Sequence, residues 1–257
     1  MKILVCIKQV PDMESRFKLN AAGTWYSDQD LAWRMNEYDE FAVEQAILLR
    51  EKIGDAEVVI LCVGPDRVKE TMKKGLAMGA DRGLHIQDEA SYDKDPFQIA
   101  SAIAAYASDQ NFDLIFTGMQ SQDRGSAQVG LLLAGILGIP AVSTIVGFDF
   151  DGKEVTVRRE LEGGLKSVHK TVLPALFTCQ LGLNTPRYPT LPNIMKAKKK
   201  ELVSIPVGEL LKVEALTATT LTRFPDRKGG GVILEGEISD LTAQLMSILK
   251  EKTAVLK

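Results

Sequence analysis

An alternation of apolar, strand-like runs with helical segments most constrains the fold of this chain. Residues 3–7, ILVCI, form a continuous apolar run, as expected of a strand that is buried on both faces. Further strand-like runs lie at 57–63, 83–86 and 113–118, and helical spacing of apolar residues marks 37–52, 66–78, 96–109 and 126–138. Strands that alternate with helices through short connectors form parallel sheets covered on both faces. We therefore expect an α/β fold with a mostly parallel, doubly wound, Rossmann-like sheet.

The pattern changes after residue 140. Extended runs flank Asp151-Gly152, which predicts a hairpin, and residues 167–179 supply more extended chain. We therefore expect later antiparallel strands in a mixed sheet. Regularity is lost from about residue 184, and a glycine-rich stretch at 223–237 precedes an amphipathic helix near 238–252. Such a tail buries little surface by itself, so we expect it to pack on another subunit.

Composition excludes several classes of protein. A formal net charge of −3 argues against a general nucleic-acid binder, which is normally basic. The widely spaced Cys6, Cys62 and Cys179 are predicted to be small core residues in a reducing compartment. The two histidines, His85 and His169, have no second ligand at metal spacing, so we expect no protein-ligated metal site.

The first ten residues, MKILVCIKQV, hold only five consecutive apolar residues between lysines. This run is too short for the apolar region of a signal peptide, and no later segment reaches transmembrane length. We therefore expect a cytoplasmic protein without a membrane span.

The loop TGMQSQDRGSAQVG, residues 117–130, is the richest candidate site. It leaves the carboxyl end of a predicted strand and enters a helix at about Ser126, which is where open α/β sheets bind anionic ligands. Gly118 and Gly125 allow close backbone approach, while Ser121 and Asp123 can form hydrogen bonds. The loop is either a phosphate cradle for a nucleotide or a well-capped turn without a ligand.

The ends of the first two strands would complete such a nucleotide pocket. Cys6 and Val63 would form apolar walls, and MNEYDE, residues 35–40, opens the first helix beside them. Alternatively, Asn36 is a simple N-cap with Asp39 in the capping-box position.

Motifs for catalysis are absent. EGGLKS at 162–167 does not satisfy the Walker A pattern, and KQVPDME stands where a G-x-G-x-x-G would follow the first strand. There is no G-x-S-x-G elbow, and the sequence gives no pattern from which we expect a histidine to activate a serine or cysteine nucleophile. The sequence indicates a nucleotide holder without catalytic residues of its own.

Residues 187–203, RYPTLPNIMKAKKKELV, combine an apolar tip with four lysines, Lys196, Lys198, Lys199 and Lys200. Neither a central strand with Pro192 in its interior nor a core helix with a lysine cluster is consistent with this composition. The stretch fits either an exposed apolar tip beside a basic collar or a linker that its lysines keep soluble.

Several stretches together resemble the β subunit of electron-transfer flavoproteins, and the resemblance runs through essentially the whole chain. They are ILVCIKQVPD, MNEYDEFAVEQA (35–46), KKGLAMGADRGLHI (73–86), the 117–130 loop, VRRELEGGLKSVHKTVLPAL (157–176) and NTPRYPTLPNIMKAKKK (184–200). The last stretch is the most specific. The resemblance implies a heterodimer whose α subunit carries most of a redox-active FAD, while the β subunit usually holds a structural AMP.

The resemblance also implies roles for individual residues. The residues expected around the nucleotide are Cys6, Asn36, Glu37, Tyr38, Asp39, Val63, Gly118, Met119, Gln120, Ser121, Gln122, Asp123, Arg124, Gly125, Ser126, Ala127, Gln128 and Val129. Glu160 matches a residue that orients the mobile FAD domain. The partner dehydrogenase would be bound by Leu191, Pro192, Asn193, Ile194, Met195 and Lys196, with Leu191 as the anchor.

The implied organisation has three parts. Residues 1–183 would form the nucleotide-binding domain, 184–203 the partner recognition loop, and 204–257 an arm that packs on the α subunit. Electrons would pass from acyl-CoA or related dehydrogenases to a quinone-linked oxidoreductase.

Some residues depart from the family pattern. Lys166 stands where an acid or amide is usual, and Met13 occupies a place that is aromatic in some members. Bifurcating members, which hold a second FAD in place of AMP, tend to read DGDTAQVG where this chain reads DRGSAQVG, so the shared AQVG favours them. Against that, MNEYDEFAVEQA is closer to the AMP-holding members, so AMP is the favoured ligand. A nucleotide-binding stress or sensor module is the alternative of another class, although it would lack the 184–200 stretch.

Overall fold

We analysed a computed structural model of the chain, which describes residues 1–226 and 231–253. Residues 227–230 of the predicted glycine-rich stretch and residues 254–257 of the predicted arm lie outside the described part. The chain forms two compact units, Met1–Thr222 and Arg223–Lys257.

The first unit is built on a nine-stranded sheet with the order β11-β5-β4-β1-β6-β10-β7-β8-β9. Its strands are β1 Lys2–Ile7, β4 Glu57–Gly64, β5 Arg82–Gln87, β6 Leu114–Gly118, β7 Ala141–Phe150, β8 Val155–Glu160, β9 Lys166–Thr171, β10 Ala175–Cys179 and β11 Leu202–Pro206. A separate antiparallel pair joins β2 Gln9–Pro11 to β3 Trp33–Met35. The mostly parallel α/β fold expected from the alternating pattern is confirmed.

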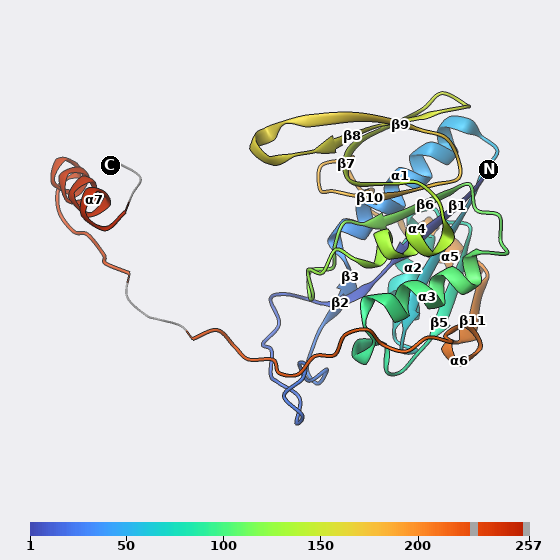
Figure 1. Ribbon diagram of the computed structural model, residues 1–257, viewed down its shortest axis with the longest axis horizontal. Coiled ribbons are helices and arrows are strands. Elements are labelled where there is room, and N and C mark those ends of the chain that lie inside the picture. Colours follow the sequence, from blue (N-terminus) through green and yellow to red (C-terminus); the bar gives the residue numbers. More distant parts are fainter. Residues whose placement is uncertain (227–230, 254–257) are drawn as a thin grey trace. The chain divides into compact units, whose positions relative to one another are not determined.

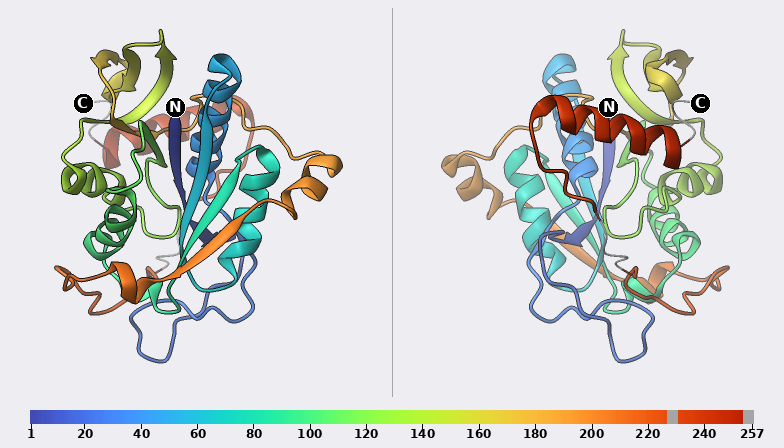
Figure 2. Two further views of the ribbon diagram at one scale, coloured as in Figure 1. Left: turned by 90° about the vertical axis from the view of Figure 1, so that its right-hand side faces the viewer. Right: turned by 90° about the vertical axis from the view of Figure 1, so that its left-hand side faces the viewer.

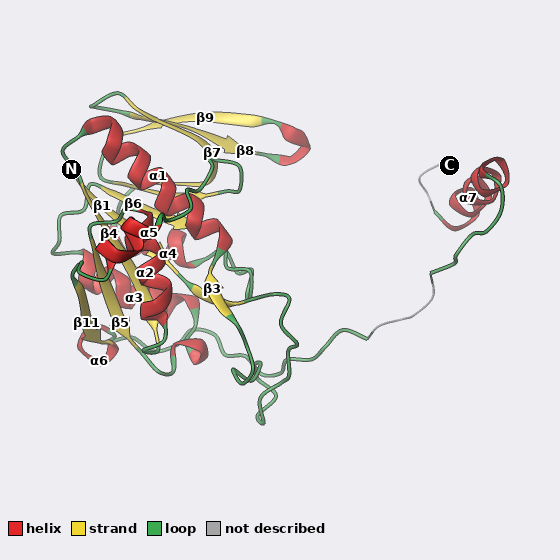
Figure 3. Cartoon of the chain, turned by 180° about the vertical axis from the view of Figure 1, so that it is seen from behind, coloured by secondary structure: helices red, strands yellow, loops and turns green. Residues whose placement is uncertain are grey.

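Helices cover both faces of this sheet (Figures 1 and 3). They are α1 Glu37–Ile53, α2 Val68–Met78, α3 Pro96–Ala107 and α4 Val129–Leu137, with the short helices α5 Leu191–Ala197, α6 Val207–Leu210, η1 Ser91–Asp93 and η2 Glu162–Gly164. In Figure 2, α1 and α2 lie on one side of the parallel strands and α3 and α4 on the other. The two buried clusters follow this division, because successive residues of β1 enter opposite cores.

The end of the sheet beyond β6 is mixed. β7, β8 and β9 are antiparallel neighbours, which confirms the predicted hairpin around Asp151-Gly152. β10 follows β9 in the chain but lies between β6 and β7, parallel to both. All five residues of β10 are buried, as a strand covered on both faces requires.

The expectation that regular structure ends at about residue 184 is wrong for residues 202–206. These residues form β11, which pairs in parallel with β5 at the sheet edge. Pro206 ends the strand, where the lack of an N–H group costs least.

The described residues of the second unit, 223–226 and 231–253, contain the helix α7 Ile238–Lys252, at the position predicted for an amphipathic helix. None of its residues is buried, and Ile238 is 82% exposed. An isolated helix of this length is only marginally stable in water. Packing of its apolar side chains against another surface would stabilise it.

Candidate functional site

A crevice opens at the carboxyl edge of the parallel strands, where β1, β4 and β6 end. Its walls come from Cys6, Ile7, Lys8, Gln9, Asn36, Asp39, Leu61, Val63, Ser91, Tyr92, Lys94, Pro96, Ile99, Ile103, Thr117, Gly118, Met119, Gln120, Ser121, Arg124, Ser126, Ala127, Gln128, Val129 and Gly130. Ligands bind at this edge of open α/β sheets because strand ends and helix N-termini meet there. The loop after β6 and the end of β1 therefore contribute to one cavity, as the sequence predicted.

Asn36 binds the 117–130 loop rather than capping α1. Its Nδ2 donates to the carbonyl of Gln120 at 2.9 Å, and its Oδ1 accepts from the N–H of Gln122 at 3.0 Å. It makes no side-chain capping bond to α1, so the alternative of a simple N-cap is wrong. The buried amide finds both partners in a loop more than eighty residues away in the chain.

Asp39 is also not a capping-box residue. Its carboxylate accepts from the backbone N–H of Lys8 at 2.6 Å and from that of Gly118 at 3.0 Å, and so joins the ends of β1 and β6. Burial raises the pKa of Asp39 from 3.8 to about 7, and the two backbone hydrogen bonds oppose that shift. A Cβ at Gly118 would lie 2.2 Å from Asp39 Oδ1, so this strand end needs glycine.

The prediction that the loop enters its helix at about Ser126 is wrong, because α4 begins at Val129. Gly125 and Ala127 have φ angles of 61° and 53°, and this left-handed backbone interrupts the helical path. Within residues 1–226 and 231–253, the N–H groups of Ser126, Ala127 and Gln128 donate to no protein acceptor. Successive unpaired N–H groups before a helix suit a phosphate, which accepts hydrogen bonds and carries negative charge.

Two lysines line the crevice, and each has a carboxylate partner. Lys8 Nζ lies 2.7 Å from Asp123 Oδ1, and Lys94 Nζ lies 3.0 Å from Asp88 Oδ2. Burial lowers the pKa of Lys8, while the Asp123 charge and its hydrogen bond act in the opposite direction. These pairs hold cations at the cavity without leaving buried charges unpaired.

Arg124 joins the crevice to an aromatic cluster formed by Trp25 and Tyr26, which precede β3, and Tyr92 of η1. Its guanidinium lies 4.2 Å from the ring centre of Trp25 and donates to the carbonyl of Tyr92. Tyr26 packs against both Trp25 and Tyr92, with ring centres 4.7 and 6.4 Å away. The cluster fixes the position of the arginine at the rim of the crevice.

Five of the predicted nucleotide-site residues do not line the crevice but support it or lie beside it. Glu37 accepts from Gln122 Nε2 at 2.9 Å, and Tyr38 Oη bonds with Gln120 Nε2 at 3.3 Å. Asp123 forms an ion pair with Lys8, and Gly125 reverses the backbone with a positive φ angle.

The sequence reasoning missed Lys8, Gln9, Tyr92 and Lys94 as crevice residues. Lys8 could have been found, since it directly follows the first buried strand. Tyr92 and Lys94 lie in the connection from β5 to α3, which ends at the same sheet edge. Across the described residues, no three His, Cys, Asp or Glu side chains gather as a metal site would require.

The second candidate site lies within the predicted partner recognition loop, and we call its residues 188–199 the docking segment after that predicted role. It contains the short helix α5, with Pro192 in its first turn, where a missing N–H is tolerated. Its apolar side chains are exposed: Tyr188 by 92%, Leu191 by 73%, Met195 by 56% and Ile194 by 41%. α5 projects beyond α2 in Figure 2, so the predicted exposed apolar tip is present.

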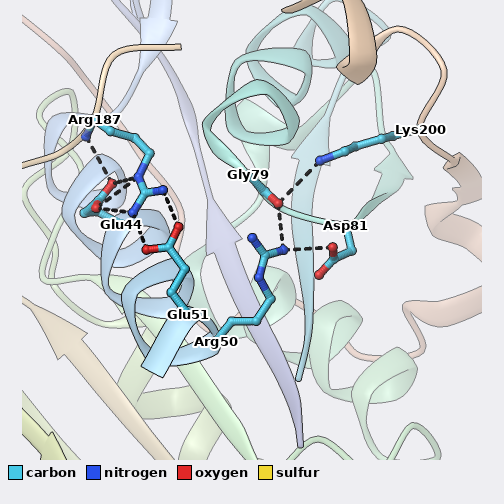
Figure 4. Close-up of polar contacts among 7 residues, drawn as sticks. All are labelled: Glu44, Arg50, Glu51, Gly79, Asp81, Arg187 and Lys200. Carbon is cyan, nitrogen blue, oxygen red and sulfur yellow. Dashed lines mark hydrogen bonds and ion pairs between the residues drawn. The ribbon is translucent and has the colours of Figure 1, made fainter. Parts of the chain in front are cut away.

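The sequence predicted that the four lysines after Met195 form one solvent-facing cluster. This prediction is wrong for one of them. Lys196, Lys198 and Lys199 are exposed. Lys200 instead points into the body and donates to main-chain carbonyls at the end of α2, including that of Gly79 (Figure 4). Of the four lysines, only the first three therefore add positive charge to the exposed surface of this segment.

Glu160 lies apart from both sites, at the end of β8 on the antiparallel part of the sheet. It is exposed and its Oε2 accepts from Gln180 Nε2 at 3.3 Å. Its expected role toward an FAD domain stays a prediction.

Among the described residues, no helix combines the length and apolarity needed to cross a membrane.

Comparison with known proteins gives a consistent result. Residues 24–210 match the model of the electron transfer flavoprotein domain. The chain is 36% identical to the electron transfer flavoprotein subunit beta of Bacillus subtilis, with 100% of both chains covered. It is 34% identical to the mouse (Mus musculus) subunit beta over 96% of this chain and 98% of that one. The mitochondrial subunit beta of Arabidopsis thaliana is 37% identical, with 91% and 93% covered. The chain therefore belongs to the electron transfer flavoprotein β-subunit family.

Proposed function

We propose that this protein is the β subunit of a cytoplasmic two-subunit electron carrier. It would bind an α subunit that holds most of a redox-active FAD, and its own crevice would hold AMP. Electrons would reach the FAD from acyl-CoA or related dehydrogenases and leave to a quinone-linked oxidoreductase. The observation that carries the proposal is the pairing of a phosphate-suited crevice with a separate, exposed docking segment.

Both the phosphate and the adenine ring of AMP fit the crevice chemically. The unpaired N–H groups of Ser126, Ala127 and Gln128 can donate to a phosphate monoester. Cys6 and Val63 line the cavity and give an adenine ring an apolar wall. Lys8 and Lys94 add positive charge nearby while their carboxylate partners keep the site almost neutral overall.

The chain's own residues would hold and orient rather than catalyse. Asn36 and Asp39 fix the loop and the strand ends through hydrogen bonds to backbone groups. When bound, the FAD supplies the redox chemistry. This chain would position that flavin relative to a partner and bind the partner through Leu191 and its neighbours.

The second unit fits a role in assembly. Within its own unit, α7 presents Ile238, Leu245 and Met246 as exposed side chains. We assign these side chains to a contact with the α subunit. Removal of residues 223–257 should leave Met1–Thr222 folded by circular dichroism but weaken co-purification of the α subunit. Undiminished co-purification would overturn the assignment.

A second FAD in place of AMP is the alternative, as in bifurcating members of the family. The sequence AQVG at 127–130 favours it, and these residues line the crevice. The test is chromatography of the nucleotides released from the denatured α–β complex. One FAD and one AMP per heterodimer would support the simple carrier. Two FAD without AMP would make the crevice a second redox site and overturn the AMP assignment.

A further inference from the structure

The docking segment, residues 188–199, cannot hold its own conformation. α5 has seven residues, and helices shorter than about twelve are unstable alone in water. Of the helix, only Ala197 is buried, while the apolar side chains proposed to meet a partner face solvent. Whatever orders this segment must therefore act from its flanks.

Arg187 fixes the N-terminal flank to α1. Its Nε and Nη2 lie 2.9 Å from the two carboxylate oxygens of Glu44, and its Nη1 lies 2.6 Å from Glu51 Oε1 (Figure 4). The backbone N–H of Arg187 also donates to Glu44, at 3.0 Å. The Glu44 side chain is 4% exposed, so the fork is seated on a buried carboxylate. Bidentate pairing fixes direction as well as distance.

Lys200 fixes the C-terminal flank to the end of α2. Its Nζ lies 3.0, 3.4 and 2.5 Å from the carbonyl oxygens of Leu76, Gly79 and Ala80. A cation suits carbonyls at the C-terminus of a helix, because they carry the negative end of the helix dipole. Directly after Lys200, the carbonyl of Glu201 accepts from Gly83, and β11 begins.

The two anchors share a base. Gly79 O accepts from Lys200 and also from Arg50 Nη1, at 2.9 Å, and Arg50 lies on α1 next to Glu51. α1 therefore contacts the first anchor directly and the second through the end of α2, as Figure 4 shows. The segment leaves and re-enters the same rigid pair of helices.

We propose that Arg187 and Lys200 are positioning residues that pre-order residues 188–199 for docking. The inference rests on the proposed docking function. The ordered segment presents Leu191, Ile194 and Met195 beside the exposed lysines, which fits a partner with an apolar pocket rimmed by carboxylates. A fixed segment loses less conformational entropy when it binds than a flexible one does.

The test uses the α–β heterodimer and three variants, Lys200→Met, Lys199→Met and Arg187→Lys. Lys199→Met is the matched control, since it removes the same charge from the same stretch without touching α2. Arg187→Lys keeps the charge but loses the fork. Amide hydrogen exchange of residues 188–199 reports order without any partner. Steady-state reduction by an acyl-CoA dehydrogenase and its acyl-CoA substrate reports docking.

We expect faster exchange in Lys200→Met and Arg187→Lys, but not in Lys199→Met. The KM for the heterodimer should rise about tenfold in the first two at unchanged kcat, and about twofold in the control. Unchanged exchange, or equal KM changes in Lys200→Met and Lys199→Met, would overturn the proposal. Leu191→Ala separates the two claims. If it leaves KM unchanged, the docking function fails, while the exchange data still decide whether the anchors order the segment.

Discussion

The crevice and the docking segment hold their side chains in opposite ways. In the crevice, the side chains of Asn36, Asp39 and Lys8 form hydrogen bonds or ion pairs with other parts of the protein. In the docking segment, Leu191 touches solvent over 73% of its surface, and the fixing contacts lie behind it. The proposed nucleotide would be held in a preformed polar cavity. The proposed transient partner would be met by an exposed apolar face on fixed supports.

The largest expected effect is at the crevice, with Gly118→Ala. The added Cβ would lie 2.2 Å from Asp39 Oδ1 and 2.7 Å from the Tyr38 Cβ. Such overpacking should lower the free energy of unfolding by about 2 kcal/mol. Nucleotide content of the purified heterodimer should fall with it, measured by chromatography after denaturation.

Gly135→Ala is the matched control, because a Cβ there meets nothing within 4 Å. It lies inside α4, where alanine should stabilise the helix by up to about 1 kcal/mol. If both variants destabilise equally, the packing argument for Gly118 is wrong.

Leu191→Ala should give the reverse pattern, with docking impaired and stability kept. Loss of a buried apolar anchor costs about 2 kcal/mol, so kcat/KM for reduction by a dehydrogenase should fall about thirtyfold. Flavin content and the urea midpoint should not move. Leu216→Ala, at another side chain that is 70% exposed, is the control and should leave kcat/KM unchanged.

The raised pKa of Asp39 predicts that the free energy of unfolding depends on pH through this one crevice residue. Its pKa is raised from 3.8 to about 7, so between these values the folded chain binds a proton that the unfolded chain has released. The contribution of Asp39 to the free energy of unfolding therefore falls as pH rises through this window.

Asp39→Asn should remove that dependence. The slope of the unfolding free energy against pH should become less negative by up to about 1.4 kcal/mol per pH unit, measured by urea unfolding between the two pKa values. The exposed Asp109→Asn serves as control. An unchanged slope in Asp39→Asn would mean that this carboxylate is ionised throughout.

The smallest expected effect is that of salt. Lys196, Lys198 and Lys199 are exposed, so their steering of a partner should be screened. Raising ionic strength from low to physiological values should increase the dehydrogenase KM roughly threefold. Nucleotide content should stay constant, because the crevice ion pairs are largely buried. Salt-independent docking would show that the apolar face acts without electrostatic help.

Local patterns predicted most elements of the fold. Apolar runs located β1, β4, β5 and β6, and helical spacing located α1, α2 and α3, because burial on a sheet leaves a direct periodic signal. The position of β10 between β6 and β7 could not be read from such patterns. Strand order depends on partners that are distant in the chain, and β11 was missed for the same reason.

The location of the candidate site could be predicted from the sequence, but most of the contacts within it could not. The 117–130 loop and the end of β1 were found because strand ends meet at one edge. The roles of Asn36 and Asp39 were not, since a capping pattern looks the same whether the side chain bonds its own helix or a distant loop. Lys200 resembled its neighbours in sequence, and only tertiary structure separates it from them.

The place of β10 has a consequence for synthesis on the ribosome. Within the described part of the chain, β7 pairs only with β8 and β10. Residues 141–171 can therefore fold as an antiparallel meander but cannot join the parallel sheet until β10 emerges. Until then, the edge of β6 stays open, and open strand edges template aggregation. Mutations that slow the pairing of residues 175–179 with β6 and β7 should therefore lower the yield of soluble protein more than they lower the stability of the folded protein.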